Sequence, residues 1–208
     1  PVLAIDATAI VRRTIPGATL TFTRHPNPGI TPQGKAAEAL DHVRRQGHED
    51  FVRFEPWVPY RDRGAFFERY DVALLTFPQS IETDLSMRTR IYDYLWGGLP
   101  VVTSSATGTD QILQRYKAGS VLAAGGAEAF ATEIIRVLQD GRRREEMVAG
   151  ATRFVRDHQW PNALAPLRDF CRAPRLETSK ESFAVPLNVP QQRPSILHRL
   201  RRRMGGAL

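Results

Sequence analysis

Cysteine and long hydrophobic runs are nearly absent from this sequence. Its 208 residues include one cysteine, Cys171, which excludes an internal disulfide framework or a multi-cysteine zinc site and is compatible with a reducing compartment. The five histidines show no metal-ligand spacing, so no metal site is predicted. No run approaches the ~18 apolar residues that span a bilayer. Hydrophobic and charged contents of 42% and 25% are typical of a globular domain with a core.

Familiar catalytic signatures are missing as well. The sequence has no G-x-S-x-G, no phosphate-binding G-x-x-x-x-G-K and no cysteine with a histidine nearby. The net charge of +7 is local, because residues 174–208 hold seven Lys or Arg and two Glu, which leaves +2 for residues 1–173. The nearly balanced charge of residues 1–173 argues against a nucleic-acid partner.

Proline and polar residues dominate residues 173–208, which predicts a disordered basic tail after a domain at residues 1–172. The last part, residues 195–208, has the pattern of a short basic amphipathic helix. Peripheral contact with a membrane is one interpretation of this pattern, and a solvated end without function is the other.

Hydrophobic patterns of the strand and helix types alternate along the chain. Strands are predicted at residues 19–23, 51–54, 72–75, 101–103 and 119–122, and helices at 2–14, 35–46, 62–69, 86–96, 109–117, 127–139, 142–157 and 163–170. Residues 77–85 are predicted to be a loop. The alternation implies an α/β fold, a Rossmann-like doubly wound parallel sheet with helices on both faces. Ligands of such sheets bind at the carboxyl ends of the strands.

The segment at residues 86–104 is the most informative. Tyr92, Leu95 and Trp96 fall on one face of the predicted helix, and Gly97 and Gly98 stand where a helix end needs a positive φ. The Pro-Val-Val that follows cannot continue the helix and opens a buried strand.

Charged residues of the same segment indicate an anionic ligand with hydroxyl groups. Arg88 and Arg90 stand at the start of the predicted helix, where a helix N-terminus and guanidinium groups suit a diphosphate. Asp93, one turn later, can accept hydrogen bonds from a sugar or a ribose. The combination predicts a nucleotide-sugar site.

With residues 20–28 (LTFTRHPNP), 51–76 and 81–90 (IETDLSMRTR), this segment resembles the C-terminal domain of GT-B-fold glycosyltransferases of the group 1 type. The resemblance covers roughly residues 1–172 and is strongest to a bacterial subgroup acting on surface or capsular polysaccharides. It implies transfer of a sugar from a nucleoside-diphosphate sugar, with retention and without a metal or other cofactor. It also implies a polysaccharide or lipid-linked glycan acceptor and a cytoplasmic enzyme, with the inner membrane face as a peripheral location.

The resemblance further implies a gap in the sheet. In the family, a strand with a glycine-rich loop precedes the helix predicted at residues 2–14, and an N-terminal acceptor domain precedes both. That strand is central in the doubly wound order 3-2-1-4-5-6. We therefore expect a sheet with a gap or a rearranged pairing, and no turnover by these 208 residues alone.

Individual roles also follow from the resemblance. Asp93 would bind the ribose, where the family usually has glutamate, and an ion pair with Arg90 is the alternative. Of Arg88 and Arg90, one would bind the diphosphate and the other would form a structural salt bridge. Glu82 would contact the donor sugar, with Asp84 as the alternative acid or as a helix cap.

Further candidates come from backbone and loop positions. They are the phosphate-binding N–H groups of Leu85, Ser86 and Met87, the base-holding loop of Trp57, Val58 and Pro59, and the strand-end residues His25 and Thr103. A structural role stays open for the aromatic loop and for the histidine. Two rival functions also stay open: a nucleotide-sugar epimerase of the same fold, and a non-catalytic binding module whose basic tail contacts anionic lipid.

Overall fold

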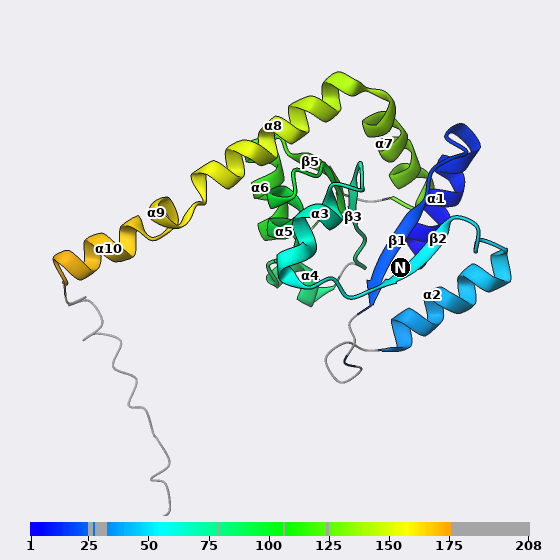
Figure 1. Cartoon of the computed structure of the whole chain (residues 1–208), viewed down its shortest axis with the longest axis horizontal. Coiled ribbons are helices and arrows are strands. Elements are labelled where there is room, and N and C mark those ends of the chain that lie inside the picture. Colours follow the sequence, from blue (N-terminus) through cyan, green and yellow to red (C-terminus); the bar gives the residue numbers. More distant parts are fainter. Residues whose placement is uncertain (25–26, 28–32, 79, 106, 124, 176–208) are drawn as a thin grey trace, which may run out of the picture. The chain divides into compact units, whose positions relative to one another are not determined.

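The computed structural model describes residues 1–24, 27, 33–78, 80–105, 107–123 and 125–175 (Figure 1). The chain divides into two compact units, Pro1–Ala163 and Leu164–Leu208. The second unit contributes helix α10 (Ala165–Arg172) to the description. The helix predicted at residues 195–208 lies outside the described residues. No helix in the described part of the chain is long and apolar enough to cross a membrane.

Strands and helices alternate in the first unit, as the sequence predicts. The strands are β1 (Leu20–Arg24), β2 (Val52–Pro56), β3 (Ala73–Leu75), β4 (Val101–Ser104) and β5 (Gly119–Leu122). The helices are α1 (Val2–Thr14), α2 (Gln33–Gln46), the 3-10 turn η1 (Tyr60–Asp62), α3 (Arg63–Phe67), α4 (Ile81–Leu85), α5 (Arg90–Trp96), α6 (Thr107–Tyr116), α7 (Ala127–Gln139), α8 (Gly141–Asp157) and α9 (Trp160–Ala163).

The described strands pair in parallel within two separate sheets, in the orders β1-β2 and β3-β4-β5. Leu20 is in register with Val52 in the first sheet, and Val101 lies between Ala73 and Gly119 in the second. If the two sheets were joined edge to edge, their strands would follow the doubly wound order. No described strand fills the central position of that order, which lies between β1 and β3. The gap expected from the sequence is therefore present.

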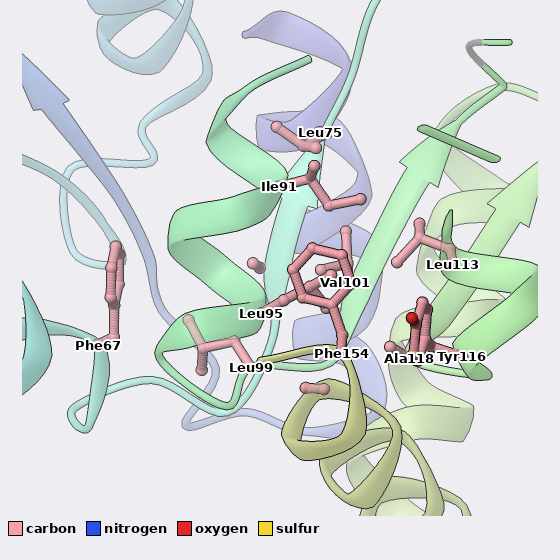
Figure 2. Close-up of a cluster of buried hydrophobic side chains, with 12 residues drawn as sticks. Phe67, Leu75, Ile91, Leu95, Leu99, Val101, Leu113, Tyr116, Ala118 and Phe154 are labelled. Carbon is pink, nitrogen blue, oxygen red and sulfur yellow. The ribbon is translucent and has the colours of Figure 1, made fainter. Parts of the chain in front are cut away.

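Helices cover both faces of the strands, because neighbouring strand residues point to opposite sides. On β4, Val101 packs into a cluster with α5, α6 and α8, shown in Figure 2, whereas Val102 packs against α1 and α7. Figure 1 shows α5, α6 and α8 on one side of the strands and α1 and α7 on the other. The predicted fold class is thus confirmed.

Helix α1 holds the two sheets together across the gap. Its residues Ala4 and Ile5 belong to a cluster with β1, β2 and α2, while Ala7 and Val11 belong to the cluster under β4 and α7. Leu74 of β3 packs against both clusters. Burial of apolar surface on both sides of one helix therefore replaces the hydrogen bonds that β1 and β3 do not exchange.

The segment at residues 77–96 differs from the sequence prediction. Residues 81–85, predicted as loop, form α4, and the following helix begins at Arg90 rather than at residue 86. Its buried face is made by Ile91 and Leu95, while Trp96 is half exposed. Gly98 has the predicted positive φ of 72°, but Gly97 does not, with a φ of −74°.

Candidate functional site

A cavity of about 1410 Å³ opens between the two sheets. Its wall at the carboxyl ends of β1, β2 and β3 includes Thr23, Trp57, Val58, Phe77, Arg90 and Asp93. Pockets for small molecules usually hold about 300–1000 Å³. This cavity is larger because it continues between the facing edges of β1 and β3, down to residues of α1. The end at the carboxyl edge is where a doubly wound sheet binds its ligand.

Asp93 is held at this edge by an arginine from another helix. Nη1 of Arg63, on α3, donates to Oδ2 of Asp93 at 2.7 Å. The alternative pairing of Asp93 with Arg90, three residues earlier, is therefore wrong. The Asp93 side chain remains 34% exposed, so its carboxylate can still accept hydrogen bonds from a ligand.

Aromatic side chains of the loop after β2 surround the same arginine. The Arg63 guanidinium lies 5.0 Å from the ring centre of Trp57 and 5.5 Å from that of Tyr60. Tyr60 in turn stacks on Trp96, at 6.3 Å between ring centres. The predicted base-holding loop, with the half-buried Val58 and the exposed Pro59, thus contacts the same arginine as Asp93 and lines the same cavity.

The two predicted diphosphate ligands have different surroundings. Arg88 is only 16% exposed, lies 4.1 Å over the ring of Phe77 and donates to the hydroxyl of Thr83 at 2.9 Å. Arg90 is exposed, lines the cavity beside Asp93 and has no ion pair with the described residues. The geometry makes Arg88 the structural arginine and leaves Arg90 as the candidate for an anion.

Helix α4 carries both acidic candidates for the donor sugar. Ser80 caps this helix by accepting a hydrogen bond from the N–H of Thr83, at 3.1 Å. Asp84 is therefore not a helix cap, because it lies within α4, and α5 has no side-chain cap. Glu82 is 81% exposed and its carboxylate is 3.5 Å from Arg88, a weak contact that leaves it open to a ligand.

The predicted phosphate donors lie at the end of α4 and in the segment that follows it, rather than at the start of α5. The N–H of Ser86 donates to the carbonyl of Glu82 at 2.9 Å and is engaged in closing α4. The Ser86 hydroxyl, in contrast, is buried and has no partner among the described residues. Leu85 and Met87 have exposed side chains.

Of the two strand-end candidates, the structure describes Thr103 alone. Thr103 is fully buried and its hydroxyl donates to the carbonyl of Ser104 at 2.8 Å, so its predicted contact with ligand is wrong. It is buried because β4 has a neighbouring strand on each side and helices over both faces. His25 lies outside the described residues.

The titratable groups that line the cavity include the partly buried phenol of Tyr94. Burial raises the pKa of Tyr94, on α5, above its ordinary value, so its hydroxyl stays neutral. Within the described ranges, no three His, Cys, Asp or Glu residues come together in a way that would hold a metal ion.

Comparison with known proteins decides the family. The family described as "Glycosyl transferases group 1" matches residues 4–140, which include both sheets and every site residue discussed above. The chain belongs to the group 1 glycosyltransferases. Curated protein sequences compared with the chain gave no match.

Solved structures share the fold of this glycosyltransferase chain. Anabaena HepE, solved in complex with UDP-glucose, is 17% identical with a TM-score of 0.64, over 82% of this chain and 44% of its own. Sucrose-phosphate synthase from Thermosynechococcus elongatus is 16% identical with a TM-score of 0.62, over 82% and 42%. WaaG, a glycosyltransferase involved in lipopolysaccharide biosynthesis, is 15% identical with a TM-score of 0.51, over 81% and 51%. This chain thus spans less than half the length of the first two.

Arg63 is the site residue that sequence reasoning missed. It stands 30 positions before Asp93, so no local spacing rule connects the two. The only available signal is its place in an aromatic loop at the carboxyl end of a strand, in the sequence WVPYRDR.

Proposed function

We propose that this chain binds the nucleoside-diphosphate sugar of a retaining, metal-independent glycosyltransferase. The acceptor is a polysaccharide or a lipid-linked glycan at the cytoplasmic face of the membrane. The observation that carries the proposal is the arrangement of Asp93, Arg90 and the Trp57 loop around one end of the cavity, at the carboxyl edge of the strands.

Each part of the donor has a chemically suitable group in this arrangement. The Asp93 carboxylate accepts hydrogen bonds from the ribose hydroxyls, and the base lies against the loop of Trp57, Val58 and Pro59. Arg90 offsets the negative charge that grows on the diphosphate as the glycosidic bond breaks, which is the main electrostatic demand of the reaction. Glu82 contacts the sugar from α4.

Acceptor and mechanism rest on the family rather than on the site. HepE was solved with UDP-glucose, and WaaG is involved in lipopolysaccharide biosynthesis, which supports a nucleotide sugar as donor and a glycan as acceptor. Retention and independence of metal rest on the family resemblance. Turnover that is unchanged by a chelator would support the second point, and its loss would contradict it.

Calorimetric titration of the full-length protein with UDP, GDP and dTDP tests the donor site. One nucleotide is expected to bind, and Asp93→Asn and Arg90→Ala are each expected to weaken it more than about tenfold, or ~1.4 kcal/mol. Asp41→Asn, which changes an exposed acid on α2 that does not line the cavity, is the matched control and should leave affinity unchanged. No binding by any of the three nucleotides would contradict the proposed donor site.

A further inference from the structure

We infer that Arg63 is a positioning residue that holds the Asp93 carboxylate in the orientation required by the ribose. The inference rests on the proposed donor site and adds to it a residue that would touch neither the base nor the phosphates. Arg63 would act through Asp93, so its removal should change how well the protein distinguishes ribose from deoxyribose.

The first observation is how the two side chains share the carboxylate. A carboxylate has two oxygens with about four lone-pair sites. Arg63 uses Oδ2, at 2.7 Å, and within the described part of the chain no hydrogen bond reaches Oδ1. One oxygen is thus fixed by the protein while the other keeps its lone pairs, and the side chain is 34% exposed, so that Arg63 and a sugar hydroxyl can be bound at the same time.

The second observation is that Arg63 is itself fixed on several sides. Its side chain is only 19% exposed, and its guanidinium lies between Asp93 and the rings of Trp57 and Tyr60. Tyr60 stacks on Trp96, which belongs to the same helix as Asp93. The arginine therefore joins the loop after β2 to helix α5, and an orientation imposed on it is passed to the carboxylate.

A planar, forked cation suits this place better than an ammonium group. A guanidinium can stack on aromatic faces through its plane while donating along its edge, whereas lysine presents a point charge on a flexible chain. Arg63→Lys should therefore keep the positive charge but lose most of the orientation. This separates a positioning role from a purely electrostatic one.

Arg69 provides a matched control elsewhere in the same unit. Its guanidinium also lies over two aromatic rings, those of Phe66 and Tyr70, and it also pairs with a carboxylate, that of Glu55, at 2.8 and 3.1 Å. It has no contact with Asp93. Arg69→Gln thus removes a similar set of interactions without altering the orientation of the ribose acid.

The experiment measures the affinities of the full-length protein for UDP, GDP and their 2′-deoxy forms, in the wild type, Arg63→Gln, Arg63→Lys, Arg69→Gln and Asp93→Asn. For the nucleotide that binds, the wild type should prefer the ribose form by about tenfold, the value of one hydrogen bond to a charged group. Arg63→Gln and Arg63→Lys should reduce this preference to about threefold or less, close to that of Asp93→Asn. Arg69→Gln should keep it.

If Arg63 had only a structural role, its variants would bind the ribose and the 2′-deoxy nucleotide more weakly by the same factor. An unchanged ratio of these two affinities would overturn the inference while leaving the donor site intact. A wild type that binds both forms equally would also overturn it. If neither these four nucleotides nor dTDP binds the wild type, the proposed function itself fails. Binding of dTDP alone, whose sugar already lacks the 2′-hydroxyl, would keep the donor site and overturn the inference. Thermal melts identify variants that do not fold, and if Arg63→Gln is one of them, Arg63→Lys decides the ratio.

Discussion

Gly97, at the end of α5, is predicted to be required for packing rather than for its backbone conformation. Its φ of −74° is one that alanine adopts readily. A Cβ atom there would lie 2.7, 2.8 and 2.9 Å from Cδ2, Cβ and Cγ of Phe67, which is buried in the cluster beneath α5. Gly97→Ala should therefore destabilise the protein by overpacking.

The magnitude follows from two opposing effects. Overpacking costs about 1–3 kcal/mol, and we expect the upper half of that range because one clashing atom is the Cβ of Phe67, which moves only with its backbone. Alanine lowers the entropy of the unfolded chain, which returns about 0.4–1 kcal/mol. The free energy of unfolding of Gly97→Ala should thus fall by about 1–2.6 kcal/mol.

Urea unfolding of a double-mutant cycle with Phe67→Ala measures this clash. Phe67→Ala removes the Cδ2 and Cγ contacts but keeps the Cβ contact, so it should reduce the cost of Gly97→Ala by about 0.5–1 kcal/mol without abolishing it. Gly98→Ala is the matched control: it meets no atom within 4 Å but has a φ of 72°, so its cost of about 1–2 kcal/mol should not depend on Phe67. A neutral Gly97→Ala, or a cost that Phe67→Ala leaves unchanged, would refute the reasoning.

Two further predictions concern stability. Arg88→Ala should lower the free energy of unfolding by about 2 kcal/mol, because it removes a charged hydrogen bond to buried Thr83. Arg90→Ala should change it by less than about 0.5 kcal/mol. Equal losses of the two variants in urea unfolding would contradict this prediction. The raised pKa of Tyr94 gives stability that is present below its ordinary value of 10.0 and lost as pH rises above it. Tyr94→Phe should therefore lose less stability than the wild type between about pH 9 and 11 in thermal melts, and parallel losses would argue against it.

The sequence predicts the elements that carry strong apolar periodicity. The bounds of α1, β5 and α7 are as predicted, because their apolar residues pack against the core clusters and each element ends near glycine, proline or aspartate. Helix α4 was missed because it has no such face: Ile81 and Leu85 are exposed, and its one buried residue is Thr83. Ser80, with acids following it, was the available signal of a helix start.

Placement of the site residues depended on tertiary contacts that spacing does not encode. Within the sequence, Arg90 was the nearest cation to Asp93, but the folded chain brings Arg63 there instead. Arg88 resembled a ligand because its ring partner Phe77 and its acceptor Thr83 are outside the helix pattern. The edge of the sheet at which Asp93, Arg90 and the Trp57 loop gather was predictable, whereas the individual pairings were not.

The account depends most on a nucleotide binding at the carboxyl edge of the strands. Amide hydrogen exchange of the full-length protein, measured with and without a saturating nucleotide, tests this directly. We predict slower exchange in residues 57–63 and 86–97, and no change in α7 and α8. Binding that leaves the first two segments unchanged, or that protects α7 and α8 instead, would contradict the account.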